Sequence, residues 1–400
     1  MNPIIWRLAV IAAALPFSVR AQALDLRHAI DLAVATSPEV RTATAEVEVA
    51  RRRVTTSSVS EHRPELGVSA GPRIGFDGTV GPDVSMSFSK TIELGDKAAH
   101  REAVAAAELS KREASLDEVR VRVAAEVAEI WASWASAVDR RNRLEALLSD
   151  ARAIEQKLAA QVKTGVSTRV QGGSARMTVA RAEAERDAAD AEAAIWAAEL
   201  AVLVPVPSDG PDLSPLALPA MEGDWSADAV RRRGRVRAAL SAVETARARA
   251  ALARAETTSD LTLGAFVALE GEEVAAGLTF AFPWPGNPRA TAEALAHDAA
   301  AEAAEERAVA TGQAVRRTLV RIRATADQQS RRADVLRERV ATLMGETSAQ
   351  LGAALREGQV TAVDVLLALR EARELTMAQA DAEAAARGAV ALLIAIGGAP

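Results

Sequence analysis

Four blocks of the first half of the sequence recur in the second half at a nearly constant separation. The pairs are Pro38–Arg41 with Gly234–Arg237, Glu65–Val68 with Asp260–Leu263, Met86–Phe88 with Phe280–Phe282, and Gly165–Thr168 with Gly358–Thr361. Their offsets decline only from 196 to 193 residues along the chain. A nearly constant offset across four separate blocks is hard to obtain by chance, so the chain is predicted to contain two copies of one structural unit.

The boundaries of the two units follow from a Pro-rich segment between them. Residues 205–223 contain five prolines and read as a linker. The first unit is therefore predicted at 24–204 and the second at 224–400. Each unit is expected to contain a helix, two strands and a long helical hairpin. The first of these helices is expected from about Leu26 to His62.

Four segments alternate between apolar and small or polar residues. They lie at about 65–74, 83–92, 260–269 and 274–282. Period-two alternation predicts strands, and about ten residues is the length of a tilted strand that crosses a membrane. A lone two-stranded hairpin is barely stable, so strands on an otherwise helical chain need partners. Two hairpins from each of three subunits would close a twelve-stranded barrel without free edges.

The remaining parts of both units predict very long helices. Apolar residues follow a 3-4 spacing from Leu116 to Val138, which is typical of a coiled-coil seam. The hairpins are expected at 97–203 and 289–396. The first arm, 97–163, would be about 100 Å long at ~1.5 Å per residue. Such helices cannot fold onto a compact core and must lie side by side in a bundle or a tube.

The N-terminus reads as a secretory signal peptide, residues 1–23. Arg7 supplies a positive charge, Leu8–Phe17 is a short apolar run, and Ala21–Ala23 fits the small-residue cleavage pattern. The apolar run is too short to span a bilayer as a helix. The alternatives are an N-terminal anchor or a buried helix.

Composition excludes several classes of function. The chain has no cysteine and a net charge of −6, so thiol chemistry is excluded and nucleic-acid binding is disfavoured. The four histidines are scattered, and no phosphate-binding or metal-ligand motif is found. We therefore expect no catalytic residue, no cofactor, no metal site and no nucleic-acid partner. The arginine runs 51–53 and 231–233 are interpreted as solvated helix faces or headgroup contacts.

Several motifs make the chain resemble the TolC family of outer-membrane efflux ducts over essentially its whole mature length. Leu24–Ala33 with Ser37–Arg41 is similar to the family's opening motif, and Arg356–Leu366 to its second helical turn. Thr91–Lys97 and Phe282–Pro288 resemble segments of the CzcC-like branch, which serves heavy-metal pumps of the resistance-nodulation-division (RND) class. The implied fold is mainly α: a trimer with a short outer-membrane β-barrel and a long helical barrel in the periplasm.

The resemblance also implies roles for particular residues. The tips that would meet the adaptor are Gly165, Val166, Ser167 and Thr168 in the first hairpin and Gly358, Gln359, Val360 and Thr361 in the second. Asp364 would line the periplasmic entrance. The alternatives are ordinary helix–helix turns and a carboxylate placed by the helix dipole.

One face of the strands is expected to meet lipid. Its residues are Leu66, Val68, Val84, Met86, Phe88, Leu261, Leu263, Leu278 and Phe280. Arginine at Leu263 should destabilise the barrel by about 2–4 kcal/mol if that position is near the membrane midplane. Arginine at Thr262 should cost little.

The expected function is passive export through an outer-membrane duct of a tripartite efflux system. A homotrimer would work with a periplasmic adaptor and an inner-membrane pump. The pump is expected to be of the RND type and to export heavy-metal cations. One alternative is a duct for type I protein secretion. The other is a soluble periplasmic coiled-coil scaffold or adaptor.

Overall fold

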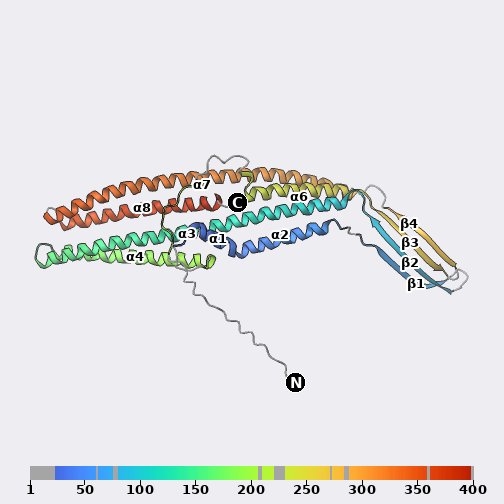
Figure 1. The fold of residues 1–400 in the computed structure, drawn as a ribbon, viewed down its shortest axis with the longest axis horizontal. Helices are drawn as coiled ribbons and strands as arrows, with labels where there is room; N and C mark the ends of the chain where they lie inside the picture. Colours follow the sequence, from blue (N-terminus) through green and yellow to red (C-terminus); the bar gives the residue numbers. More distant parts are fainter. Residues whose placement is uncertain are drawn as a thin grey trace, which may run out of the picture.

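The protein is a long rod of helices with a small sheet at one end (Figure 1). The computed structural model describes residues 23–59, 62–74, 80–205, 210–219, 230–270, 273–282, 288–357 and 361–397. The predicted signal peptide, up to residue 22, therefore lies outside the described residues. Within the described part, no helix combines the length and the apolar character needed to cross a membrane.

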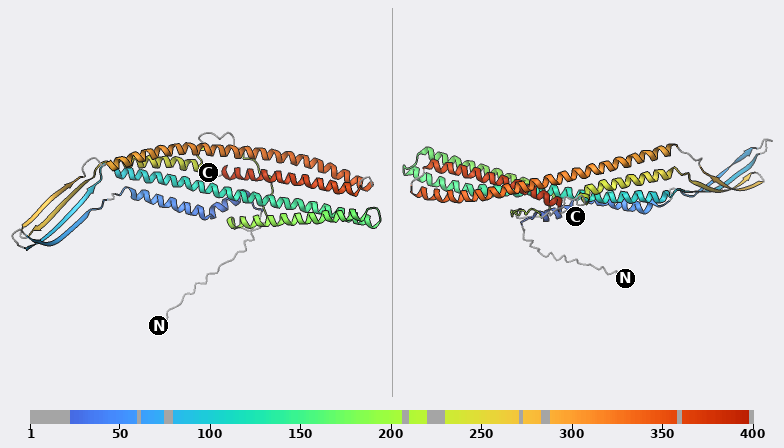
Figure 2. Two further views of the ribbon diagram at one scale, coloured as in Figure 1. Left: turned by 180° about the vertical axis from the view of Figure 1, so that it is seen from behind. Right: turned by 90° about the horizontal axis from the view of Figure 1, so that it is seen from above.

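Two helices run along the whole rod. Helix α3 spans Lys97–Lys163, the range expected from the sequence, and α7 spans Pro288–Glu357. Each turns back at the end far from the sheet, α3 into α4 (Arg169–Leu203) and α7 into α8 (Ala362–Gly397). The two views of Figure 2 show both hairpins side by side along the same axis.

The two halves of the rod use different partners for α3 and α7. Toward the hairpin tips, the packing order is α4, α3, α8, α7. Toward the sheet, α2 (Pro38–Ser57) and α6 (Gly234–Glu256) take the places of α4 and α8. The rod is therefore one curved layer of helices, and α4 and α7 form its two edges at the tip half (Figure 1).

The predicted first helix is two helices. Helix α1 (Leu26–Thr36) ends at Ser37, whose side chain accepts a hydrogen bond from Val40 N–H and caps α2. Pro38 follows at the first position of α2, where its missing N–H leaves no bond unmade. The prediction of one continuous helix from Leu26 to His62 was wrong because Pro38 disfavours helical backbone at Ser37.

The largest apolar core lies near the middle of the rod, where α1 crosses α3. Trp131 of α3 is fully buried there, and its indole Nε1 donates to the carbonyl of Leu24 at 2.9 Å. The linker joins this core, because Leu24 forms a β-bridge with Pro211 and Leu213 and Leu216 pack against it. The described part of the Pro-rich segment thus packs against the helices near the middle of the rod.

The sheet is antiparallel with strand order β1-β2-β3-β4. The strands are β1 (Glu65–Ile74), β2 (Val80–Ile92), β3 (Leu261–Glu270) and β4 (Glu273–Ala281). The pairing of β2 with β3 joins the two repeats, which the sequence could not specify. Strands β1 and β4 are the edges, and each has one side unpaired within the described chain.

Candidate functional site

One face of the sheet is almost entirely apolar. The cross-strand register aligns Leu66 with Phe88, Val68 with Met86, and Ala70 with Val84, so these side chains share a face. The same face continues through β3 and β4, since Val84 pairs with Leu269 and Ala265 with Leu278. All nine residues expected to meet lipid lie on it. They are Leu66, Val68, Val84, Met86, Phe88, Leu261, Leu263, Leu278 and Phe280.

The opposite face carries mostly small residues. Ser69 and Ser85 share a hydrogen bond of 2.8 Å across β1 and β2, and Thr91 and Thr262 share another of 2.8 Å across β2 and β3. Glycines on this face accept the side chains opposite them: an added Cβ on Gly264 would lie 2.4 Å from Thr279 Oγ1. Small residues on one face and large ones on the other suit a sheet that curves toward its small face.

Phe266 is a large residue on the small face, as the alternation along β3 requires, and it was not among the residues singled out from the sequence. It pairs with Ser87 on one side and Gly277 on the other. Its ring occupies the space above Gly277, where an added Cβ would lie 2.7 Å from a ring carbon. The aromatic ring therefore lies along the small face of the sheet and fills the space left by the glycine.

The register places Leu263 near the helical end of the sheet rather than at its middle. Leu263 pairs with Lys90, two residues before β2 ends at Ile92. A charged side chain is therefore already present at this level of the apolar face. Leu263 therefore lies away from the middle of the sheet, whereas Met86 lies at the centre of β2 on the same face.

A set of ion pairs joins the sheet to the helices. Lys97, at the start of α3, donates to Asp260 just before β3 at 2.7 Å, and Leu94 N–H donates to the same carboxylate at 3.0 Å. Arg101 donates to Glu93 at 2.7 Å. These pairs are mostly shielded from solvent, so they fix the direction in which the sheet leaves the rod.

The first hairpin tip is a tight, exposed turn. Gly165 adopts φ +79°, a left-handed conformation that glycine allows after a helix. Val166 projects with 73% of its surface exposed. Thr168 then caps α4 through a capping box: its Oγ1 accepts from Gln171 N–H at 3.2 Å, and its own N–H donates to the Gln171 side chain at 2.8 Å.

The second tip repeats this cap with a carboxylate. Thr361 N–H and Oγ1 both donate to Asp364 Oδ2, at 2.9 and 2.6 Å, and Asp364 N–H donates back to Thr361 Oγ1 at 3.3 Å. These hydrogen bonds from Thr361 hold the pKa of Asp364 below its ordinary value. Gly358, Gln359 and Val360 lie outside the described residues. Asp364 is thus a capping residue in this chain, and its place at an entrance stays a prediction.

Polar contacts link α8 to the first hairpin. Arg373 forms a two-pronged pair with Glu185 of α4, at 2.7 and 2.6 Å. Burial raises the pKa of Glu185, but hydrogen bonds from Arg373 and Arg181 outweigh it and hold the pKa below its ordinary value. Higher on α8, Glu383 is buried and accepts from Arg143 of α3 and Arg337 of α7. The sequence held no signal for these pairs because they join distant segments.

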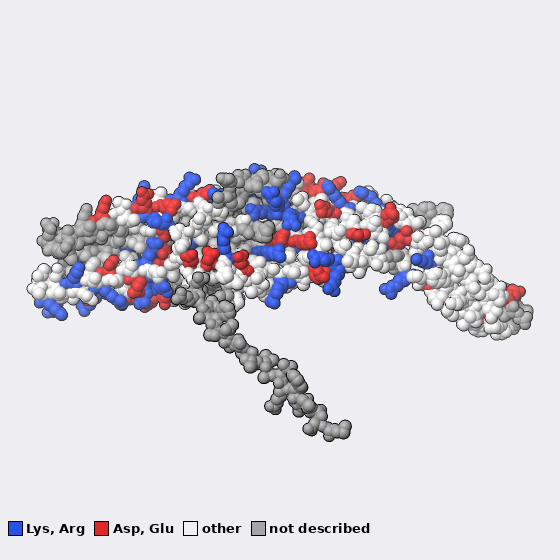
Figure 3. Space-filling view, in the orientation of Figure 1, with Lys and Arg blue, Asp and Glu red and all other residues white. Residues whose placement is uncertain are grey.

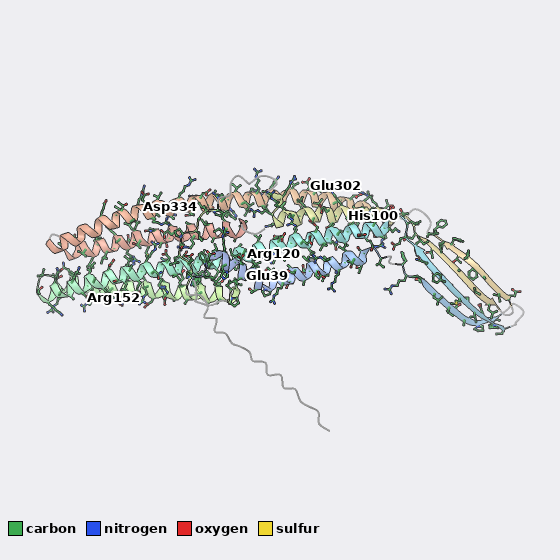
Figure 4. The ribbon with its side chains drawn as sticks, in the orientation of Figure 1. Glu39, His100, Arg120, Arg152, Glu302 and Asp334 are labelled. Carbon is green, nitrogen blue, oxygen red and sulfur yellow. The ribbon has the colours of Figure 1, made fainter. Side chains whose placement is uncertain are left out.

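Charged residues are otherwise spread along the rod. Figure 3 shows mixed charge over the helices and a nearly uncharged sheet, and Figure 4 shows Arg152, Glu39 and His100 far apart. Among the described residues, no group of three or more His, Cys, Asp or Glu could hold a metal ion.

Residues 29–204 match the family described as outer membrane efflux protein. The match ends at the residue where the first repeat was expected to end. No curated protein matches the sequence significantly. The family match therefore covers the predicted first repeat.

Solved structures extend the likeness to the whole chain. A crystal structure of CusC, described in terms of folding and transmembrane channel formation, has a TM-score of 0.75 at 16% identity and covers 98% of both chains. The open state of the MtrE outer membrane channel of Neisseria gonorrhoeae has a TM-score of 0.71 at 17% identity, covering 93% of this chain and 88% of that one.

The outer membrane protein VceC of Vibrio cholerae is a third neighbour. It has a TM-score of 0.69 at 20% identity and covers 93% of this chain and 96% of that one. At these identities the likeness concerns the fold. The predicted fold class, mainly helical with four antiparallel strands, is confirmed.

Proposed function

We propose that this chain forms an outer-membrane efflux channel rather than an enzyme. The observation that carries the proposal is the two-faced sheet at the end of the rod. An exposed face made of Leu66, Val68, Met86, Phe88 and Leu278 is costly in water and favourable in lipid. Because small residues occupy the other face, the sheet can curve around a lumen with its large side chains outside.

The unpaired edges support a homotrimer. A sheet with open edges is not viable in lipid, because its free N–H and C=O groups would lack partners. Three copies would close β1 of one chain on β4 of the next, giving twelve strands. The edges of the helical layer also have apolar residues without partners, including Met177 and Val202 on α4 and Leu295 and Val309 on α7. They would meet in the same assembly.

The partners and cargo are the finer part of the proposal. The exposed turn at Gly165–Thr168 and the predicted second tip, Gly358–Thr361, would contact a periplasmic adaptor. An inner-membrane pump of the RND type would drive transport. Asp364 would lie at the periplasmic entrance. The assignment of heavy-metal cations as the cargo rests on the segments that resemble the CzcC-like branch. A row of carboxylates at the far end of the small face, Asp83 beside Glu270 beside Glu273, would favour cations in the lumen.

Fractionation and mass measurement test the channel. The protein should appear in the outer-membrane fraction and, in detergent, have three times the mass of one mature chain. A soluble periplasmic monomer would overturn the proposal and leave the scaffold or adaptor alternative. Sensitivity of a deletion strain to zinc, cobalt or cadmium then tests the cargo. Normal metal resistance with loss of a secreted protein would favour the type I secretion alternative.

A further inference from the structure

We propose that Lys90 binds the phosphate of an anionic phospholipid in the periplasmic leaflet of the outer membrane. The inference rests on the proposed function and names a lipid partner for the same sheet. Among the six charged residues of the strands, the register puts five on the small face. They are Glu65, Arg73, Asp83, Glu270 and Glu273. Lys90 alone lies on the apolar face.

Lys90 lies at the level along the sheet that is expected for lipid headgroups. Its cross-strand row contains Leu263 and Phe280, and the row beside it contains Phe88. From Lys90 to Val80 at the other end of β2 there are ten residue steps. At ~3.4 Å per residue and a tilt of about 40°, these steps rise about 26 Å, close to the ~25 Å apolar band of outer-membrane barrels. Lys90 therefore lies at the edge of that band nearest the helices.

The aromatic neighbours indicate the same level. Phe280 and Phe282 are exposed by 68% and 64%, and Phe88 by 50%. Aromatic side chains flank the apolar band where hydrocarbon meets headgroups. A lysine there can lay its methylene stem on the phenyl rings while its ammonium reaches the phosphates.

Lys90 lacks a counterion from the protein within the described residues. The carboxylates at the base of the sheet are already engaged: Asp260 pairs with Lys97, and Glu93 pairs with Arg101. Glu65 lies on the other face, in the row of Ser89. Lys90 is exposed and takes part in no ion pair described for this chain. An ammonium at a membrane surface attracts anionic lipid, and one such charge corresponds to about a fivefold preference.

Thermal unfolding in mixed micelles tests the site. The full-length mature protein is compared in micelles with equal fractions of phosphatidylglycerol or phosphatidylcholine. For the wild type, Tm should be higher in the phosphatidylglycerol micelles than in the phosphatidylcholine micelles. Lys90→Gln should lose at least half of that difference, while Lys90→Arg keeps it. Lys111→Gln, which removes an exposed lysine of α3 far from the sheet, should also keep it.

The outcomes separate this inference from the proposed channel. If Lys90→Gln retains the full difference, or Lys90→Arg loses it as Lys90→Gln does, the lysine does not bind the phosphate. Outer-membrane localisation of both variants would then leave the channel proposal standing. A wild-type protein that remains soluble without detergent would overturn both. Raising the salt from ~0.1 M to ~1 M, which shortens the Debye length from ~10 Å to ~3 Å, should reduce the wild-type difference.

Discussion

At the scale of single residues, the small face of the sheet depends on glycines that hold a neighbour's side chain. Gly67 accepts Ser87, Gly264 accepts Thr279, and Gly277 accepts Phe266. A packed surface of this kind tolerates extra atoms poorly. It also allows the strands to curve, since the inner face of a closed sheet has less room than the outer face.

Gly277→Ala should therefore destabilise the sheet, because the new methyl group would lie 2.7 Å from the ring of Phe266. We expect a loss of about 1–3 kcal/mol, seen as a lower Tm. Gly71→Ala is the matched control, since nothing lies within 4 Å of its added Cβ. In the double variant with Phe266→Ala, the loss at Gly277 should nearly disappear. Additive losses in the double variant would contradict the packing described here.

At the scale of elements, α8 is held to the first hairpin by ion pairs between segments far apart in sequence. Arg373 and Glu185 are 188 residues apart, and both side chains are about three-quarters buried. Their paired geometry fixes α8 against α4 in the half of the rod near the tips. This contact adds to the packing of α8 against α3 in holding the two hairpins together.

Arg373→Gln should lower the free energy of unfolding by about 1 kcal/mol, because a two-pronged pair with partial burial exceeds an ordinary surface pair. The folded-state pKa of Glu185 is lowered, so this stabilisation is present above the unfolded-state pKa and is lost as pH falls through the folded-state value. Thermal unfolding should thus show wild type and variant converging in acid. Arg370→Gln, whose partner Glu374 is on the same exposed helix face, should change Tm little at any pH. A constant gap across pH would refute the assignment.

The caps at the two tips give a second prediction for elements. Thr361→Ala should speed hydrogen exchange in the first turn of α8, because the amide of Asp364 loses its acceptor. Thr168→Ala should do the same in α4. Thr376→Ala, which removes a hydroxyl from the middle of α8, should leave that turn unchanged. Equal exchange in all three variants would mean that the caps do not hold the tips.

At the scale of the whole molecule, the proposed channel requires one face of the sheet to meet lipid and the other to line water. Met86→Arg and Ser87→Arg compare the two faces at the same depth, the centre of β2. Met86→Arg should cost about 2–4 kcal/mol at the midplane, so the yield and Tm of the outer-membrane trimer should fall. Ser87 is exposed, so an arginine there can extend away from the small face, and Ser87→Arg should lower both much less. The reverse ranking would mean that the small face meets lipid and the apolar face lines the water-filled lumen.

Local sequence patterns predicted most of the helices and strands. The α3 range and the β1 range agree with the sequence analysis because helical periodicity, caps and alternation are properties of neighbouring residues. β2 begins three residues before the expected strand, at Val80, where Gly81 and Pro82 weaken the alternation. The break at Ser37 shows that one proline can outweigh a continuous helical pattern.

By itself, the sequence indicated the internal repetition, the lengths of the four long helices and the two-faced character of each strand, because these properties depend mostly on residues close together in the chain. Only the tertiary structure decided which faces combine. The pairing of β2 with β3 brings Thr91 to Thr262, 171 residues away, and puts Lys90 in one row with Leu263 and Phe280. The tertiary structure also placed Arg373 on Glu185, 188 residues away. Register and helix contacts of this kind arise between distant segments, where no local preference specifies the partner.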